Sequence, residues 1–160
     1  VAEVLLNKGD KLAEQVGAKA FLSIHADATD KPQISGFHTY YTPDYRQKQS
    51  EQLAKLVADA LDKQTDMPPG TKEVVRKANF LVTRETTMPA TLVELGRMTN
   101  KEDALKLNSK KFKKEAGEAI ADAVDKHYKS NNDAADHEKD DKDDEQTSVS
   151  SGPSRKYSAI

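Results

Sequence analysis

The chain has 160 residues, enough for one domain with a hydrophobic core, and a formal net charge of −2 from 25 basic and 27 acidic side chains. This near balance of charge gives no strong indication of nucleic-acid binding. The absence of cysteine excludes disulfides, thiolate metal sites and a cysteine nucleophile. No apolar run approaches the roughly 18 residues of a membrane span, so we expect no transmembrane segment.

The first part of the chain predicts one helical segment and two strands. Residues 1–18 are typical of a helix, or of two short helical pieces, that ends near Gly17. The short apolar run AFLSI, residues 20–24, predicts a buried strand. GFHTYYT, residues 36–42, is rich in aromatic and β-branched side chains and is followed by Pro43, so it predicts a second strand.

A long helix and one or two short strands are predicted in the middle of the chain. Residues 47–64 show the clearest helical pattern in the sequence. The apolar face of this helix consists of Leu53, Leu56, Val57, Ala60 and Leu61. DMPPG, residues 66–70, ends the helix and forms a loop. Apolar runs around 74–75 and 80–82 then predict one or two strands.

One more strand and two helices complete the periodic part of the chain. ATLVEL, residues 90–95, is an apolar strand candidate that ends at Gly96. Asn100 can cap the next helix, where a negative charge on Asp103 in the first turn is favourable. Ser109 can cap the last helix. Its apolar stripe consists of Phe112, Ala116, Ala119, Ile120, Ala123, Val124 and Tyr128.

Strands that alternate with helices predict an α/β fold, in which a central, mostly parallel sheet is flanked by helices. We expect residues 1–129 to form this domain. Residues 130–160 contain few apolar side chains and a block of acidic ones, so we expect an acidic, disordered tail. This tail would be a solvated linker or terminus, or alternatively a specific acidic interaction segment.

His25 and Glu94 are the two residues whose chemistry does not suit their surroundings. His25 follows the apolar run 20–24, at a carboxyl end of a strand, where α/β sheets bind ligands. It is either a hydrogen-bonded structural residue or a metal ligand. Glu94 lies among apolar neighbours, and burying an unpaired carboxylate is costly. It is either paired with Arg84 or Arg97, or it is a general base whose pKa burial raises. Both residues lie toward the carboxyl ends of their strands, so parallel strands would place His25 and Glu94 at one rim of the sheet.

These segments together resemble a known family. The chain contains, in this order, SIHADAT, GFHTYYT, SEQLAKLVADAL, ANFLVTRETTMPATLVELGRMTN and a closing amphipathic helix. The order and spacing resemble those of the zinc-dependent N-acetylmuramoyl-L-alanine amidases of the amidase-3 type, from about Asn7 to Tyr128. The resemblance implies a zinc amidase and carboxypeptidase-like α/β fold. It also implies hydrolysis of the amide between N-acetylmuramic acid and L-alanine in peptidoglycan.

The resemblance assigns roles to individual residues and a cofactor, Zn²⁺. It implies that His25 is a zinc ligand and that Glu94 is the catalytic glutamate that activates the metal-bound water. The resemblance assigns no role to Arg84, which is a candidate either to bind a substrate carboxylate or to pair with Glu94 or Glu85. The substrate implies an extracytoplasmic protein, secreted or associated with the cell wall, that acts in cell wall degradation as an autolysin.

The sequence also departs from the family pattern. The family takes its zinc from two histidines and a glutamate, and the first histidine and the glutamate precede the segment that matches SIHA. Here no histidine precedes Ser23 and the chain begins with Val1. We therefore expect that the N-terminal portion of the domain is missing and that this chain alone is inactive. Asp27 stands where the family commonly has Asn, and Arg97 where it commonly has an aromatic residue.

Some alternatives stay open at this point. His38 is a candidate spare ligand, but alternation along residues 36–42 favours a solvated or partly buried position for it. A second function is a peptidoglycan-binding or regulatory module that does not cleave its ligand. A third is a cytoplasmic α/β domain in which His25 and Glu94 are satisfied structural residues.

Overall fold

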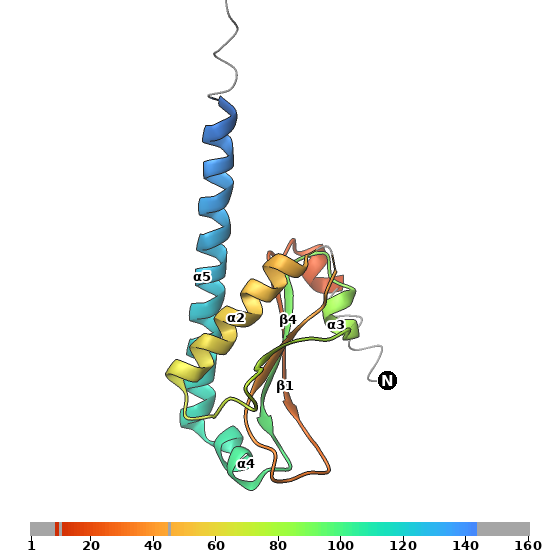
Figure 1. The fold of residues 1–160 in the computed structure, drawn as a ribbon, viewed down its shortest axis with the longest axis vertical. Coiled ribbons are helices and arrows are strands. Elements are labelled where there is room, and N and C mark those ends of the chain that lie inside the picture. Colours follow the sequence, from red (N-terminus) through yellow and green to blue (C-terminus); the bar gives the residue numbers. More distant parts are fainter. Residues whose placement is uncertain (1–8, 10, 45, 144–160) are drawn as a thin grey trace, which may run out of the picture. The chain divides into compact units, whose positions relative to one another are not determined.

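The computed structural model describes residue 9 and residues 11–44 and 46–143, with side chains described as far as Asn131 (Figure 1). The elements in chain order are β1 (Phe21–Asp27), β2 (His38–Tyr41), α2 (Gln47–Gln64), β3 (Val75–Lys77), α3 (Leu81–Arg84), β4 (Ala90–Arg97), α4 (Lys101–Asn108) and α5 (Lys110–Asp143). The chain divides into two units, Val1–Tyr128 and Lys129–Ile160, and the sheet and the site belong to the first.

The helical segment predicted at the start of the chain is only partly described. Residues 11–15 are helical, and the chain then turns at Gly17, which has a φ of 66°. The predicted end of the helix near Gly17 is therefore confirmed. Residues 1–8 and 10 of the predicted segment lie outside the described residues.

The described strands form one mixed sheet in the order β1-β4-β2-β3. β1 pairs with β4 in parallel, β2 pairs with β3 in parallel, and the central pair of β2 and β4 is antiparallel. The predicted α/β fold is thus confirmed. The antiparallel pair arises because residues 28–37, which connect β1 to β2, contain no helix, and a parallel return requires a long crossover.

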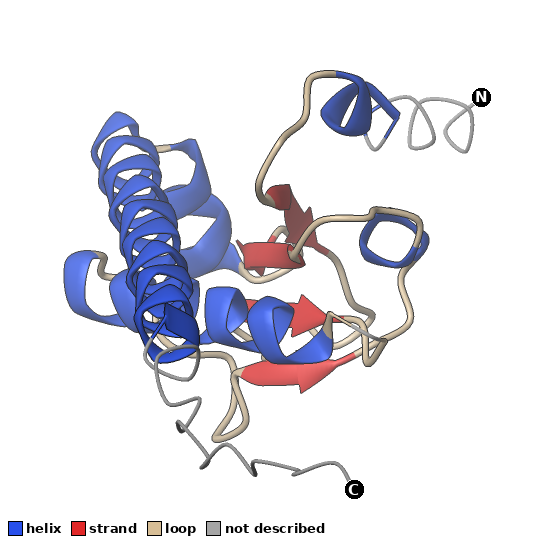
Figure 2. Ribbon diagram, turned by 90° about the horizontal axis from the view of Figure 1, so that it is seen from above, coloured by secondary structure: helices blue, strands red, loops and turns tan. Residues whose placement is uncertain are grey.

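The helices lie on both faces of the sheet (Figures 1 and 2). α2 and α5 cover one face and α3 borders the other. The core lies under α2 and α5, where Val93 of β4 is fully buried. It is completed by Phe37, Leu53, Val57, Leu61, Met67, Phe112, Ala116, Ala119 and Ala123. α2 has the bounds that the sequence predicted, and its predicted apolar face is the one that packs in this core.

The prediction of a strand at residues 80–82 is wrong, because Leu81–Arg84 form the single helical turn α3. The carbonyl of Phe80 accepts hydrogen bonds from the amides of Thr83 and Arg84, which closes the turn. An apolar run of three residues is too short to show a helical or a strand period. The other run, around 74–75, is confirmed as strand β3.

Residues 130–143, which the sequence analysis places in the acidic tail, are the end of helix α5. This part of the chain contains no Gly or Pro that would end a helix, so the helix that starts at Lys110 continues. Residues 144–160 lie outside the described residues, and the division of the chain at 129/130 stays a prediction. Of the helices that the structure describes, none combines the length and the apolar character needed to cross a membrane.

Both predicted helix caps are confirmed. The side-chain oxygen Oδ1 of Asn100 accepts hydrogen bonds from the amides of Glu102 and Asp103, each at 3.1 Å. The hydroxyl of Ser109 accepts one from the amide of Phe112 at 3.0 Å. These bonds satisfy donors that a helix start leaves without intrahelical partners, so α4 and α5 begin where the sequence predicted.

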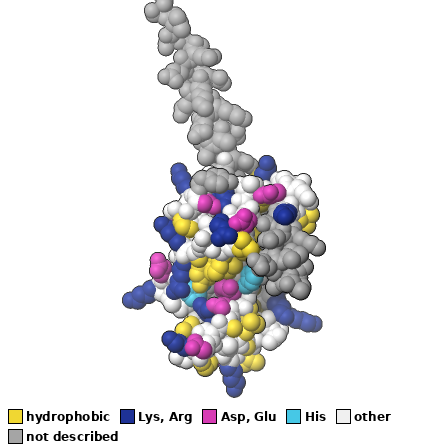
Figure 3. Space-filling model, turned by 90° about the vertical axis from the view of Figure 1, so that its right-hand side faces the viewer, with side chains coloured by type: hydrophobic (Ala, Val, Ile, Leu, Met, Phe, Trp, Pro, Cys, Tyr) yellow, Lys and Arg dark blue, Asp and Glu magenta, His cyan; other side chains and the backbone are white. Residues whose placement is uncertain are grey.

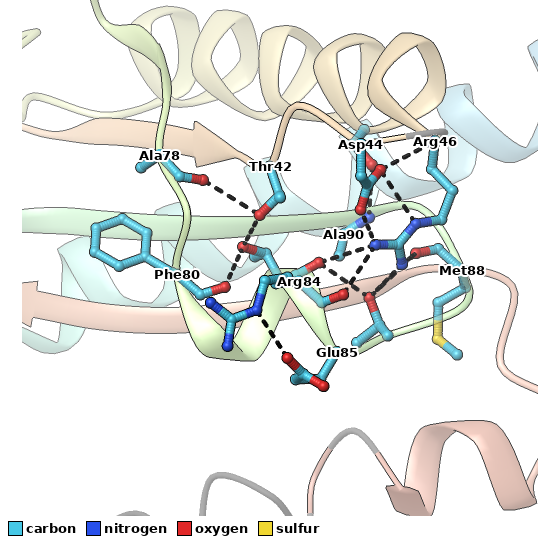
Figure 4. Close-up of polar contacts among 12 residues, drawn as sticks. Thr42, Asp44, Arg46, Ala78, Phe80, Arg84, Glu85, Met88 and Ala90 are labelled. Atoms are coloured by element: carbon cyan, nitrogen blue, oxygen red, sulfur yellow. Dashed lines mark hydrogen bonds and ion pairs between the residues drawn. The ribbon is translucent and has the colours of Figure 1, made fainter.

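Arg46, just before α2, ties the segment around α3 to the rest of the domain (Figure 4). Its side chain is 5% exposed and forms an ion pair with Asp44. Its guanidinium also donates to the Thr86 hydroxyl at 2.7 Å, to the Met88 carbonyl at 2.8 Å and to the Thr83 carbonyl at 3.2 Å. One buried cation therefore satisfies several polar groups of residues 83–88, and it holds α3 beside the sheet.

We expect Arg46→Met to lower the free energy of unfolding by about 2 to 4 kcal/mol, because it leaves Asp44 and buried carbonyl oxygens without their donor. Urea denaturation measures the change. Lys55→Met is the matched control, since Lys55 forms an exposed ion pair with Glu51 and its loss should change stability by less than about 0.5 kcal/mol. Equal effects of the two substitutions would contradict the assigned importance of Arg46.

Candidate functional site

His25, Glu94 and His38 lie next to one another on three adjacent strands. In the sheet register, His25 of β1 is the partner of Glu94 of β4, and Glu94 is the partner of His38 of β2. Residues that are direct partners point to the same face of a sheet, and adjacent strands are about 4.8 Å apart. The structure therefore brings His25 and Glu94 together, as the sequence analysis expected for parallel strands.

This row of side chains lies on the face of the sheet that α3 borders. Val93 packs in the core under α2 and α5, so its neighbour Glu94 points to the opposite face. On that face, the ring of Tyr40 contacts Phe80, the residue before α3, with ring centroids 5.3 Å apart. Figure 3 shows this side of the molecule, where hydrophobic side chains gather beside histidine and acidic ones.

Glu94 is a partly buried carboxylate whose oxygen Oε2 has no hydrogen-bond partner. Desolvation raises the pKa of Glu94 to about 7. The alternative that Glu94 pairs with an arginine is not observed, because Arg84 pairs with Glu85 and Arg97 pairs with Asp27. A partly buried carboxylate with a pKa near neutrality is typical of a functional group.

His25 is exposed, and its Nε2 lies 2.7 Å from the hydroxyl of Ser23. Ser23 and His25 are two residues apart in β1, so both point to the face of Glu94. The strand continues for two residues past His25, to Asp27. An exposed imidazole beside a partly buried carboxylate can bind a metal ion or hydrogen-bond to a ligand.

The prediction that His38 has a solvated or partly buried position is wrong, because His38 is fully buried. Gly70 packs so closely on the ring that a Cβ atom there would lie 2.0 Å from Cε1. Arg97 donates to Nδ1 at 3.2 Å, and the Thr71 hydroxyl lies 3.5 Å from Nε2. Burial, and then the charge of Arg76, lower the pKa of His38 to about 4, so the ring is neutral at neutral pH.

Arg84, the predicted substrate-binding residue, is the last residue of α3 and its side chain is 44% exposed (Figure 4). Its Nε donates to Glu85 at 2.8 Å, and its carbonyl accepts a hydrogen bond from Arg46. Of the two pairings that the sequence analysis left open, the structure shows the one with Glu85. Binding of a substrate carboxylate stays a prediction.

Asp103 was not recognised from the sequence as part of this region, and the contacts of Arg97 differ from the pairing with Glu94 that the sequence analysis considered. Asp103 is 1% exposed and accepts hydrogen bonds from the Ser35 hydroxyl at 2.6 Å and from the amides of Gly36 and Arg97 at 2.7 and 2.8 Å. It joins the loop before β2 to the end of β4. Arg97 joins Asp27 to His38. A helix-start Asp gives no sequence signal for such long-range bonds.

Gly36, just before β2, makes a close approach to Pro68 and Gly70 possible. Its φ is 96°, and a Cβ atom there would lie 2.4 Å from the carbonyl oxygen of Pro68. A residue with a side chain would be strained by its backbone conformation and would also collide with the loop. The segment that leads into β2 and His38 therefore requires glycine at this position.

A catalytic zinc ion is normally held by three protein ligands. Within residues 9, 11–44 and 46–131, no three His, Cys, Asp or Glu side chains are grouped closely enough to hold a metal ion. Both ring nitrogens of His38 have partners in the structure. The described residues fit one part of a zinc site, with His25 as an available ligand beside Glu94, but they do not complete it.

Stability should depend on pH through Glu94 and His38 in opposite directions. The raised pKa of Glu94 means that its contribution to stability is complete below pH 4.5 and is lost as the pH rises through about 7. The lowered pKa of His38 means that its contribution is complete above pH 6.5 and is lost as the pH falls toward about 4. The two effects offset each other in the parent protein between these limits.

Glu94→Gln should reveal how much Glu94 contributes to the pH dependence of stability. Relative to the parent, the variant should gain up to about 2 to 3 kcal/mol of unfolding free energy as the pH rises from 4.5 to above 7. Urea denaturation between pH 4 and 9 measures this difference. Glu85→Gln is the control and should give a smaller change, because that carboxylate is exposed. A pH-independent difference for Glu94→Gln would contradict the raised pKa.

Comparison with known proteins identifies the family. The family model described as N-acetylmuramoyl-L-alanine amidase, of the amidase-3 type, matches residues 2–126. The N-acetylmuramoyl-L-alanine amidase LytC of Bacillus subtilis is 36% identical over 118 residues, which are 73% of this chain and 23% of LytC. The N-acetylmuramoyl-L-alanine amidase CwlM of Bacillus licheniformis is 38% identical over 116 residues, 68% of this chain and 40% of CwlM.

Solved structures agree with this result. The amidase AmiC2 of Nostoc punctiforme has a TM-score of 0.67 and 34% identity, over 75% of this chain and 63% of AmiC2. The catalytic domain of the amidase CwlV from Bacillus (Paenibacillus) polymyxa has a TM-score of 0.65 and 31% identity, over 78% of this chain and 65% of that domain. The chain thus spans less than two thirds of each of these relatives. It belongs to the amidase-3 type of the N-acetylmuramoyl-L-alanine amidase family.

Proposed function

We propose that the protein that contains this chain hydrolyses the amide between N-acetylmuramic acid and L-alanine in peptidoglycan, with Glu94 as the general base. The observation that best supports the proposal is the environment of Glu94. It is the register partner of the exposed His25, its Oε2 has no partner, and burial raises its pKa to about 7. A general base is most effective when its pKa is near the working pH.

Family membership supports the reaction and the substrate. Both relatives compared above carry the name N-acetylmuramoyl-L-alanine amidase. In this reaction Glu94 removes a proton from the water that attacks the amide carbonyl. It can then return the proton to the amine of L-alanine as the bond breaks. Arg84, exposed on α3, is proposed to bind a carboxylate of the stem peptide through its guanidinium.

His25 is proposed to be a zinc ligand, and it is the one described residue that we assign to this role. Bound zinc supplies a Lewis acid and lowers the pKa of water. The remaining ligands would lie outside the described residues. The exposed position of the imidazole, with Nε2 near the Ser23 hydroxyl, is compatible with a ring that is held in place while it binds an ion.

The substrate also suggests where the protein works. Peptidoglycan lies outside the cytoplasm, so we propose a secreted or cell-wall-associated protein that acts as an autolysin. A relative from Staphylococcus epidermidis, 32% identical over 111 residues, is named a probable cell wall amidase. This name supports an extracytoplasmic location for the present protein.

A second function, peptidoglycan binding or regulation without cleavage, is favoured by one observation. The described residues contain no complete group of three metal-binding side chains. The third reading, a cytoplasmic domain with satisfied structural residues, is weakened by the unpartnered, partly buried oxygen of Glu94. The experiment must therefore separate cleavage from binding.

Glu94→Gln should lower the rate of peptidoglycan hydrolysis by about 10²- to 10⁴-fold, because it removes the general base and keeps the shape of the side chain. The substitution is made in the complete gene product that includes these 160 residues, supplied with zinc. Release of new L-alanine amino termini from purified peptidoglycan measures the reaction. Glu118→Gln is the matched control, since its exposed carboxylate lies on α5 and has no role in the proposed chemistry.

Two further measurements separate the alternatives. Sedimentation with insoluble peptidoglycan measures binding, and His25→Ala should lower the amount of bound zinc. A parent protein that binds peptidoglycan but releases no amino termini supports the non-catalytic module. Full hydrolysis by Glu94→Gln would remove Glu94 from the role of general base.

A further inference from the structure

Three strand ends meet at one rim of the sheet, next to His25 and Glu94. β1 and β4 are parallel, so their carboxyl ends lie together, and β2 is antiparallel to β4, so its amino end lies at the same rim. Asp27 is the last residue of β1, Arg97 is the last of β4, and His38 is the first of β2. These three residues come from segments far apart in the sequence.

A β-bulge lies between the site and this rim. His25 pairs with Glu94, but Asp27 pairs with Arg97, so β4 has one more residue than β1 between the two pairs. With regular alternation, Arg97 would point away from the face of Glu94. The bulge reverses its direction, which is a common effect of an extra residue in a strand. As a result, Arg97 reaches His38 on the face of Glu94.

Arg97 makes contacts with all three neighbouring segments. One guanidinium nitrogen forms an ion pair with Asp27, and the other donates to Nδ1 of His38 at 3.2 Å. The backbone amide of Arg97 donates to Asp103 at 2.8 Å. The residue is 8% exposed, and its buried Nε has no partner. Burying a charged side chain with an unpartnered donor costs free energy, so we expect Arg97 to have a structural or functional role.

The contact with His38 also fixes a tautomer. A guanidinium can only donate, so Nδ1 of His38 must accept and the ring proton must lie on Nε2, toward the Thr71 hydroxyl. Arg97 therefore controls both the alignment of the strands and the state of the histidine that lies opposite Glu94 in the register. Neither the ion pair with Asp27 alone nor the packing of the core would fix this tautomer.

We propose that Arg97 is a positioning residue of the site: by linking Asp27 to His38 across the bulge, it keeps β1, β4 and β2 aligned at the rim and holds His25 opposite Glu94. The inference rests on the proposed function for the roles of His25 and Glu94. The experiment below reads the geometry of this chain and requires no hydrolysis. Failure of the proposed function and failure of this inference are therefore distinguishable.

NMR of the 160-residue chain and its Arg97→Leu variant tests the proposal. Amides of residues 25–27 and 94–97 should exchange with solvent roughly tenfold faster or more, the effect of losing a hydrogen bond to a charged group. Amides of residues 21–23 should keep their protection. The ¹⁵N spectrum of His38 should change from the single Nε2–H tautomer to a mixture, and cross-strand contacts between His25 and Glu94 should weaken.

Two conservative variants keep the test valid if Arg97→Leu does not fold. Arg97→Lys retains a charge for Asp27 but lacks the planar fork, so the rim amides should stay protected while the His38 tautomer becomes mixed. Asp27→Asn removes the other charge and should speed exchange at the rim. Lys114→Leu is the control, because it removes an exposed ion pair with Glu118 on α5 and should change none of these signals.

Two results would overturn the proposal. One is an unchanged His38 spectrum together with unchanged rim amides in Arg97→Leu and Asp27→Asn. The other is a uniform loss of protection along the whole of β1 and β4, since that would show general stabilisation of the fold rather than positioning at the rim.

Discussion

The parallel pairing of β1 with β4 is the constraint on which the rest of the site depends. A slip of one residue in β4 would turn Glu94 into the core and Val93 out of it, so the register is strongly specified by the apolar face. Backbone hydrogen bonds hold both ends of the pair. The amide of Phe21 donates to the Pro89 carbonyl at 2.9 Å, and the amide of Met98 donates to the Asp27 carbonyl at 2.7 Å.

The two faces of this sheet perform different tasks. The face under α2 and α5 is apolar and closely packed, with Val93 and Leu53 fully buried. The other face contains an unpartnered carboxylate oxygen on Glu94 and an unpartnered Nε on Arg97, and both are unfavourable for folding. The stability gained on the first face can offset what the second face loses. Functional sites commonly break local rules of this kind.

The sequence predicted features with a local signal, such as helical periods and helix ends. It did not predict side-chain contacts that depend on how the strands are aligned. α2 was predicted with its observed bounds because eighteen residues show a clear period and DMPPG follows. The association of His25 with Glu94 followed from two strand ends in parallel strands. The local signal for the bulge that turns Arg97 toward His38 is Gly96, which the sequence analysis interpreted as the end of the strand. However, Asp27 and Arg97 are the two positions where the residue type differs from the one common in the family, and the structure shows that they are partners.

The ion pair between Asp27 and Arg97 affects the pKa of Glu94. A positive charge close to a carboxylate normally lowers its pKa, and a general base with a low pKa is weak. Arg97 is only three residues from Glu94, but its charge is offset by Asp27, and its second contact is with a neutral His38. Burial therefore determines the pKa of Glu94, which is raised to about 7. The ion pair with Asp27 thus lets Arg97 contact both β1 and β2 without lowering the pKa of the carboxylate that we propose as the base.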